Sequence, residues 1–516
     1  MDEIIIEQVI CELARVESDD VNESISVVSA FATHKWRYDG ARRSYTYLGN
    51  RFHLHASASA RIAMLEERLD WVYGRCLRHE AFRPPPPGIR RNDVHRKKLH
   101  RVDELAGVMA DLSGGARESP LLYLIGMLTQ PEDGTWCLED SGHSVEIDIS
   151  SPALQRSLGL FTETCVLLAQ GVYAPDDTSA ERAGAVSGGD AVAHAARGAK
   201  FTALTEGRIS GVFRVLELAH PPFEKRVETL RQMATVDTLR VIPTPADFAR
   251  NKGVEEKRTD AMIAVFSGVC ADSPPVLANL RTVLSGFSSA NSIPSVFVLM
   301  GNFSSRPFGA QSSDAAAFRS GMDALAAVLT DFPEIAAVSH FVLVPGAGDP
   351  GSAPVLPRPA LPNSLCKLLL DTEKLPRVTL ATNPCRLRFF TQEITIFCGD
   401  VSTRLHRASA ISPDPPPDTE QPLSQHVTET LFSQGHLLPL PLASQPVYWE
   451  MDHALRISPA PDVLILGEQN QRFWANDFND ALIFCPGDFT EGESFAVYRP
   501  ALRSVEPCDV HPRDDE

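Results

Sequence analysis

The stretch VLMGNFSSRP, residues 298–307, decides how the second half of the chain folds. An apolar run, Val296–Met300, leads into a glycine turn and then a polar loop. Buried strands of α/β proteins deliver ligand-bearing loops at their carboxyl ends in this way. This loop offers Asn302, Ser304 and Ser305 where a pair of metal ions would need carboxylates. The stretch predicts an α/β sheet whose metal-binding loop has lost its charged ligands.

Similar apolar runs recur along the rest of the chain. Between them, a helix is expected at residues 315–329, because Phe318, Met322, Leu325 and Leu329 repeat at spacings of three and four. Alternating strands and helices predict an α/β domain. Strands are expected at residues 262–266, 296–300, 341–344, 378–381, 394–397, 463–466 and 481–484.

From residue 121 the hydrophobic period changes to two, which is typical of strands. Several short strands within about a hundred residues predict a small barrel, and the OB-fold is the candidate. Such barrels bind single strands by stacking bases on aromatic rings, for which Tyr123 and Trp136 are the candidates here. A structural use of the barrel is favoured. The strands are expected at residues 121–128, between turns at 131–134 and 140–142, and at 145–149, 164–168 and 209–218.

The start of the chain is expected to be helical. Apolar spacing predicts a first short helix and a longer amphipathic helix at residues 61–79. The run RPPPPG, residues 83–88, must be an extended linker because proline lacks the amide that helices need. The basic residues between 90 and 101 are interpreted as a solvated linker rather than a phosphate-contacting patch.

These observations divide the chain into three parts. Residues 1–112 form an N-terminal helical segment with a Pro-rich linker, residues 113–225 an OB domain, and residues 226–516 an α/β domain. Residues near 174–206 are poor in large apolar groups, so they cannot bury enough surface to form part of the barrel. They are therefore interpreted as an insertion before the last barrel strand. A proline-rich loop is expected at residues 411–422.

Composition excludes several classes of protein. A net charge of −18 argues against a surface that neutralises many phosphates by itself. Ten cysteines without a C-x-x-C pair predict reduced thiols and no zinc site. No apolar stretch approaches the roughly 20 residues of a membrane helix, and the acidic N-terminus lacks the features of a signal peptide, so we expect an intracellular protein.

Five long motifs and the short run CPGDF (485–489) carry a resemblance to a known family. In this order, they resemble the B-subunit family of DNA polymerases alpha, delta and epsilon, and the epsilon members most. A looser match covers the barrel and the helix before it, so that the resemblance spans about residues 27–510. The motifs are GNFSSRPFG (301–309), FVLVPGAGDPG (341–351), TNPCRLRFFTQEITIF (382–397), LFSQGHLLPLPL (431–442) and PVYWEMDHALRISPAPDVLIL (446–466).

The resemblance implies a calcineurin-like phosphoesterase α/β sandwich following the OB domain. Eukaryotic members of the family have lost the binuclear metal site, whereas archaeal relatives retain a working nuclease. Asp, His and Asn ligands of the active pattern are replaced by glycine, alanine, cysteine, serine, asparagine or glutamate in this chain, and only the histidine at position 436 could still be a ligand. The degenerate positions are Gly268, Cys270, Asn302, Ser305, Ala347, Gly348, His436, Glu468 and Asn470.

We therefore expect no catalytic residue, no bound metal and no cofactor. The remaining polar groups have ordinary interpretations. His436 is expected to be a hydrogen-bonded packing residue, since the partners needed for a metal are absent. Asp349 is interpreted as a turn-forming side chain that bonds its own backbone. Glu468 is interpreted as a solvated acid in a loop.

The function implied by the resemblance is that of a non-catalytic accessory subunit in nuclear DNA replication. It would hold the C-terminal zinc-binding region of the catalytic subunit of DNA polymerase epsilon and meet DNA through the complex, without a membrane. Relatives commonly carry an N-terminal helical domain that engages the replicative helicase. Only about one helix precedes the matched region here, so helicase components are secondary candidates as partners.

Three alternatives stay open at this point. The chain could be the accessory subunit of another replicative polymerase. It could be a metal-dependent phosphodiesterase or nuclease with an unusual ligand set. It could also bind single-stranded nucleic acid through the barrel, with strongly salt-dependent affinity as the signature.

Overall fold

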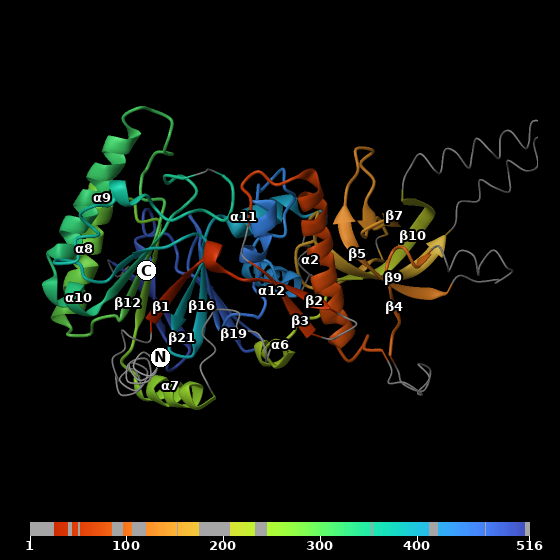
Figure 1. The fold of residues 1–516 in the computed structure, drawn as a ribbon, viewed down its shortest axis with the longest axis horizontal. Coiled ribbons are helices and arrows are strands. Elements are labelled where there is room, and N and C mark those ends of the chain that lie inside the picture. The colour runs from red at the N-terminus through yellow and green to blue at the C-terminus, as the bar shows by residue number, and fades with distance from the viewer. Residues whose placement is uncertain are drawn as a thin grey trace, which may run out of the picture.

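A computed structural model describes most of the chain, and it divides into a barrel and a larger two-sheet unit (Figure 1). The expected first helix, most of the Pro-rich linker, the insertion before the last barrel strand and most of the second proline-rich loop lie outside the described residues. The described residues are 25–39, 44–49, 52–84, 96–105, 120–151, 153–174, 207–232, 245–351, 354–411, 422–469 and 471–510.

The barrel occupies one end of the molecule. The order β5-β6-β7-β10-β9 closes back onto β5, and β7 and β10 run parallel while the other pairs in this ring are antiparallel. Leu124, Leu138 and Phe213 fill its interior. A closed five-stranded barrel agrees with the expected OB topology. The strands are β4 (Leu99–His100), β5 (Leu121–Thr129), β6 (Cys137–Glu139), β7 (Ser144–Asp148), β8 (Gln155–Arg156), β9 (Val166–Ala174) and β10 (Arg208–Ala219).

The larger unit contains two six-stranded sheets packed face to face. The first has the order β1-β15-β16-β17-β19-β18, and the second β14-β13-β12-β11-β20-β21. The first comprises β1 (Ile25–Ser29), β15 (Cys385–Phe389), β16 (Gln392–Cys398), β17 (Val463–Gly467), β18 (Trp474–Phe478) and β19 (Ala481–Cys485). The second comprises β11 (Ile263–Ser267), β12 (Val296–Met300), β13 (His340–Val344), β14 (Val378–Leu380), β20 (Ser494–Arg499) and β21 (Ser504–Asp509).

Helices cover the outer faces of both sheets, which gives four layers. α8 (Pro274–Ser289), α9 (Asp314–Thr330) and α10 (Pro333–Val338) lie on the second sheet, at the left of Figure 1. α11 (Val401–Ala408) and α12 (Leu423–Gln434) lie on the first. None of the helices that the structure describes combines the length and apolar character needed to cross a bilayer. The remaining short helices are α6 (Arg226–Gln232), α7 (Pro245–Lys257), η2 (Ala30–Ala32), η4 (Asn363–Leu365) and η5 (Trp449–Leu455).

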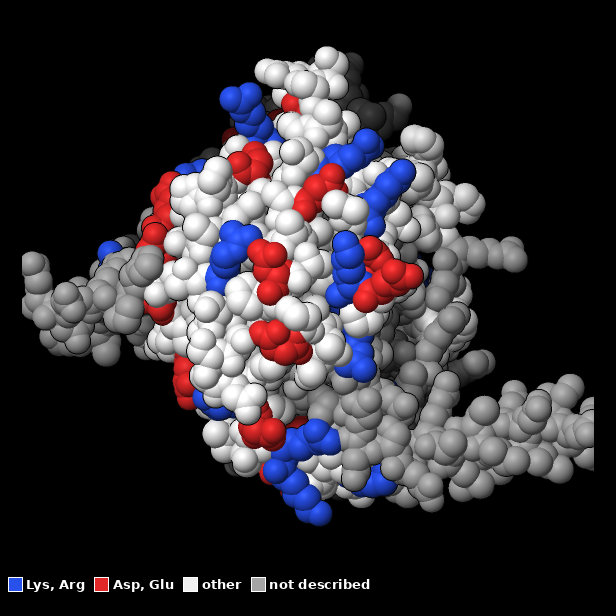
Figure 2. All heavy atoms as spheres, turned by 90° about the vertical axis from the view of Figure 1, so that its left-hand side faces the viewer, with Lys and Arg blue, Asp and Glu red and all other residues white. Residues whose placement is uncertain are grey.

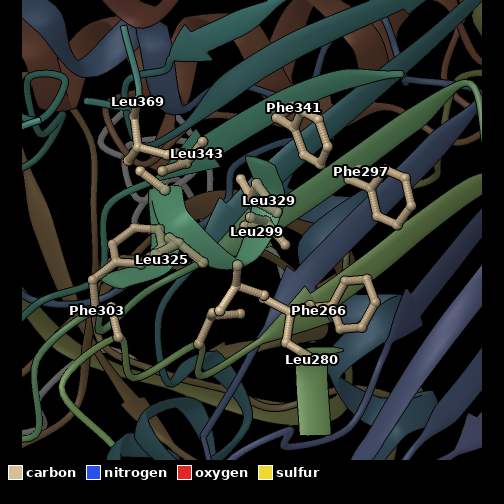
Figure 3. Packing of buried hydrophobic residues seen from close by; sticks show 14 of the residues in the cluster. Phe266, Leu280, Phe297, Leu299, Phe303, Leu325, Leu329, Phe341, Leu343 and Leu369 are labelled. Carbon is tan, nitrogen blue, oxygen red and sulfur yellow. The ribbon is translucent and has the colours of Figure 1, made fainter. Parts of the chain in front are cut away.

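The layered packing explains the continuous apolar runs. Val296 and Val298 of β12 point between the two sheets, while Phe297 and Leu299 point toward the helices. Phe297 stacks on its neighbour Phe341 with ring centroids 5.2 Å apart, and Figure 3 shows the leucines of α8 and α9 closing over this row. Strands buried on both faces have no polar side to alternate with. The seven strands expected in this region and the helix at 315–329 are confirmed.

The N-terminal segment differs from the expected helical unit. Its described part contains β1, a hairpin of β2 (Lys35–Asp39) and β3 (Ser44–Gly49), and only then α2 (Ala58–Arg78), which confirms the helix expected at residues 61–79. β1 pairs antiparallel with β15, more than 350 residues later in the chain. The sequence analysis did not predict these three strands, because the partner of an edge strand cannot be read from local spacing.

Helix α2 lies between the barrel and the two-sheet unit (Figure 1). Leu69, Val72 and Cys76 pack against barrel residues of β5 and β9. Arg68 Nε lies 3.0 Å from Asp452 Oδ2 in η5, and both side chains are buried. Arg75 donates to the carbonyl oxygens of Phe432 and Ser433 at the end of α12. α2 therefore joins the two units through one apolar face and several buried guanidinium groups.

Arg68→Met is expected to lower the free energy of unfolding by about 3–5 kcal/mol, because it leaves the buried Asp452 carboxylate without its cation. The double variant Arg68→Met/Asp452→Leu should recover part of this loss, since it removes both charges. Urea denaturation followed by circular dichroism measures both effects.

The matched control is Arg281→Met, which breaks an ion pair with Asp331 whose side chains are 51% and 54% exposed. Exposed pairs contribute about 1 kcal/mol or less. Equal losses in Arg68→Met and the control would contradict the anchoring role of Arg68.

Candidate functional site

A cavity of about 250 Å³ opens where parallel strands of both sheets end. β12 and β13 are parallel neighbours in one sheet, and β16 and β17 in the other, so the loops after these strands converge at the same edge. The lining residues come from these loops and from α11: Gly301, Asn302, Ala347, Pro354, Leu356, Arg358, Asn383, Phe397, Cys398, Gly399, Asp400, Arg404, Leu438, Gln445, Gly467 and Gln469.

The loop after β11 contains Gly268 and Cys270, the first pair of positions expected to be degenerate. Gly268 has a φ of +80°, and a Cβ there would lie 2.7 Å from Asp488 Oδ1, so the close approach of the 488–490 loop requires glycine. Cys270 is buried, and its Sγ lies 3.4 Å from the backbone oxygen of Asn302. Burial raises the pKa of the Cys270 thiol, which therefore stays protonated and is a poor metal ligand.

The loop after β12 contains Asn302 and Ser305, which face different neighbours. Asn302 Oδ1 accepts a hydrogen bond of 2.7 Å from the Gly348 amide, and its Nδ2 donates to Gln469 Oε1 at 3.2 Å. Ser305 donates through Oγ to Asp272 at 2.7 Å. The structure brings Asn302 to the cavity but turns Ser305 toward the neighbouring loop.

The loop after β13 contains Ala347, Gly348 and Asp349. Ala347 is exposed at the mouth of the cavity. Asp349 is 2% exposed, and its carboxylate accepts from the amides of Gly346 at 2.8 Å and Phe303 at 2.7 Å. The bond to Gly346 is the expected turn, and the bond to Phe303 additionally joins two loops. Burial raises the pKa of Asp349 to about 7.

Glu468, directly after β17, corrects an expectation. It was interpreted as a solvated acid, but its side chain is fully buried. Its carboxylate accepts from the amides of Val401 at 2.8 Å and Ser402 at 2.6 Å, at the start of α11. The first amides of a helix have no acceptor within the helix. Glu468, at the end of β17, supplies the acceptor for these amides of α11. Burial raises its pKa to about 7. Asn470 lies outside the described residues.

His436 lies away from this cavity, beside the buried pair of Arg68 and Asp452 that joins α2 to η5. It is 4% exposed, its Nε2 is 3.3 Å from Asp452 Oδ1, and its Nδ1 accepts from the Leu438 amide at 3.1 Å. Burial, with Arg68 nearby, lowers the pKa of His436 to about 4. The interpretation as a hydrogen-bonded packing residue agrees with this position.

The donor set at the cavity does not fit a pair of divalent cations. Asp349 and Glu468, the carboxylates left at the matched positions, accept hydrogen bonds from the protein's own amides. Among the described residues, no group of three or more His, Cys, Asp or Glu side chains is arranged to hold a metal ion. A binuclear centre needs several charged ligands that converge on one point.

Sequence reasoning missed the charged residues that do line the cavity, which are Arg358, Asp400 and Arg404. Arg358 lies in the segment LPRP, and the other two lie at the start of α11. A strand end followed by an acid, as at Cys398–Asp400, was the available signal for Asp400. No local pattern marks Arg358, which is brought to the site by tertiary packing.

The barrel offers little free aromatic or basic surface among the described residues. Tyr123 is half-buried under Lys97, whose Nζ lies 4.4 Å from the ring centroid, and Trp136 packs against the barrel core. From the basic stretch, Arg101 pairs with Asp70 at 2.9 Å and Lys98 with Glu104 at 3.5 Å. At the opposite end of the molecule, on the face of α8 and α9 that Figure 2 shows, acidic and basic side chains are interspersed.

Comparison with known proteins places this geometry in a family. Residues 263–475 match the family of DNA polymerase alpha/epsilon B subunits. Residues 58–222 match the family described as DNA polymerase epsilon subunit 2-like, OB-fold domain, which includes α2 and the barrel.

Full-length relatives agree. The chain is 30% identical over 488 residues to the DNA polymerase epsilon B subunit of Arabidopsis thaliana, covering 94% of this chain and 82% of the relative. It is 29% identical to DNA polymerase epsilon subunit 2 of Homo sapiens, covering 97% and 86%, and 27% identical to the DNA polymerase epsilon B subunit of Schizosaccharomyces pombe, covering 89% and 72%. With its OB barrel and its two-sheet unit, the chain belongs to the B-subunit family of DNA polymerase epsilon, whose members are replication accessory subunits.

Proposed function

We propose that this chain is a non-catalytic subunit that holds the C-terminal zinc-binding region of the catalytic subunit of DNA polymerase epsilon in the nucleus. The observation that carries the proposal is a near full-length similarity to epsilon subunits, combined with a cavity whose remaining carboxylates bind the protein's own backbone. A rigid core whose strand-end loops lack a set of converging charged ligands can present a surface to a partner without catalysing a reaction.

We also propose that the chain consists of an OB domain followed by a degenerate phosphoesterase domain. The four-layer arrangement supports a calcineurin-like phosphoesterase sandwich from about residue 226 onward, and the barrel supports an OB domain from about residue 113. Degeneracy of the metal site is supported by Gly268, Asn302 and Gly348, where the active pattern needs ligands. We propose that DNA is met through the complex, since the net charge is −18.

A groove between the two units is the proposed contact for the catalytic subunit. It encloses about 480 Å³ between α2, the β5–β6 region of the barrel and residues 441–443. Ile62 on α2 is 60% exposed at its edge, beside Leu65 and Leu442. Interfaces combine an apolar centre with a polar rim, and Arg61 and Glu66 supply such a rim here. A partner bound in this groove contacts both family-matched regions at once.

Ile62→Asp is expected to reduce co-purification of the catalytic subunit by roughly tenfold or more, because it places a charge among the apolar side chains at the edge of the groove. Quantitative mass spectrometry of the affinity-purified complex measures this. Leu502→Asp is the matched control, since Leu502 is also 60% exposed but lies in the β20–β21 turn.

Two results would count against these proposals. An equal effect of both variants would remove the groove as the contact. A different large partner, such as the catalytic subunit of another replicative polymerase, would overturn the epsilon assignment of the partner. Recovery of helicase components with the wild-type chain would show that the helicase link exists as well.

Manganese is expected to bind below stoichiometry to the full chain, with no nuclease activity above background, because the donor set lacks converging charged ligands. Elemental analysis after dialysis and a single-strand nuclease assay test this. His436→Ala should change neither readout. Stoichiometric manganese together with nuclease activity that disappears in His436→Ala would favour the phosphodiesterase alternative.

A further inference from the structure

The floor of the cavity at the strand ends contains a buried cation. Arg358 is 2% exposed and lines the cavity. Its Nη2 donates to the backbone oxygen of Asp349 at 2.6 Å, whereas its Nε and Nη1 have no hydrogen-bond partner. No ion pair joins it to a carboxylate within the described residues. A buried guanidinium with unpaired donors is costly, so this position favours an anion.

The neighbouring groups that could have satisfied Arg358 are occupied. Both carboxylate oxygens of Asp349 accept from backbone amides, and Glu468 accepts from the start of α11. The amide oxygen of Asn383, Oδ1, accepts from the Cys398 amide at 3.1 Å. The chain itself therefore supplies no anion to the free donors of Arg358.

A second unpaired group lines the same cavity. Asp400 precedes α11 without capping it, and its buried Oδ1 has no hydrogen-bond partner. One turn further along, Arg404 also lines the cavity and donates through Nη1 to Gln445. The charged side chains that line the cavity are thus two guanidiniums and one carboxylate, with free donors on Arg358 and a free acceptor on Asp400.

We propose that this cavity binds inorganic hydrogen phosphate. One of its charged oxygens would accept from Nη1 of Arg358, and its remaining hydroxyl would donate to Oδ1 of Asp400. A hydrogen bond from a guanidinium to an oxyanion is charge-assisted and therefore stronger than a neutral one, which favours an anion at this donor. The proposal does not depend on the identity of the partner subunit.

Size and access fit this ligand. A cavity of about 250 Å³ is several times the ~30 Å³ that one water molecule occupies in the liquid, so an oxyanion fits above the floor. Ala347 and Gln469 are exposed at the mouth, which leaves an entry route from solvent. Sulfate has similar size and charge but carries no proton near neutral pH. It would place an oxygen lone pair against the Asp400 carboxylate, so the pocket discriminates against it.

Calorimetric titration of the full chain in a phosphate-free buffer near neutral pH tests the proposal. Sodium phosphate is expected to bind at one site. At matched ionic strength, sodium sulfate is expected to bind with an affinity at least roughly tenfold lower, because it leaves a buried charge without a partner. Arg358→Met should weaken phosphate binding by about tenfold or more. Arg319→Gln, an exposed arginine on α9, is the matched control and should change nothing.

The variant Asp400→Asn tests the preference for phosphate over sulfate independently of whether Arg358→Met folds. Asp400 makes no cap bond, so the variant should fold, and its amide can donate to an anion. The preference for phosphate over sulfate is then expected to disappear. Absence of phosphate binding to the folded wild-type chain would overturn the proposal. Equal affinity for phosphate and sulfate in the wild-type chain would overturn it as well.

Discussion

The buried contact between Arg68 and Asp452 is the interaction on which the arrangement of the two units depends. Neither charge can be left alone in the interior, since a buried ion without its partner loses the hydration that it had in water. Burial opposes ionisation of Asp452, but the Arg68 guanidinium outweighs it and holds the pKa of that carboxyl well below its usual range. The pair therefore fixes α2 against η5, and the apolar face of α2 fixes the barrel.

Hydrogen bonds between α12 and the barrel reinforce the contact between the two units. Gln434 of α12 accepts from the Val166 amide of β9 at 2.8 Å and donates to the Val166 oxygen at 2.9 Å. Thr430 accepts from the Leu160 amide at 2.8 Å. These hydrogen bonds join backbone groups of the barrel to side chains of α12, so that they hold the barrel against the two-sheet unit. A shared surface of this kind suits a subunit that contacts its partner with both units.

Two buried carboxylates hold the strand-end loops in place. Asp349 and Glu468 accept hydrogen bonds from backbone amides of neighbouring loops and of α11. Burial raises the pKa of each to about 7. The loops thereby keep their conformation without a cation, while Arg358 brings a positive charge to the cavity floor.

The amino-acid sequence by itself determined seven strands of the two sheets and the helix α9, because burial on both faces is written in local residue types. It did not reveal β1, β15, β18, β20 or β21. The arginines of β15, for example, look solvent-facing until Glu393 pairs with Arg386 at 3.2 Å. Nor did it reveal the burial of Glu468 or the cavity position of Arg358. Those features depend on partners far away in the chain, and only the tertiary structure decides which charge meets which amide.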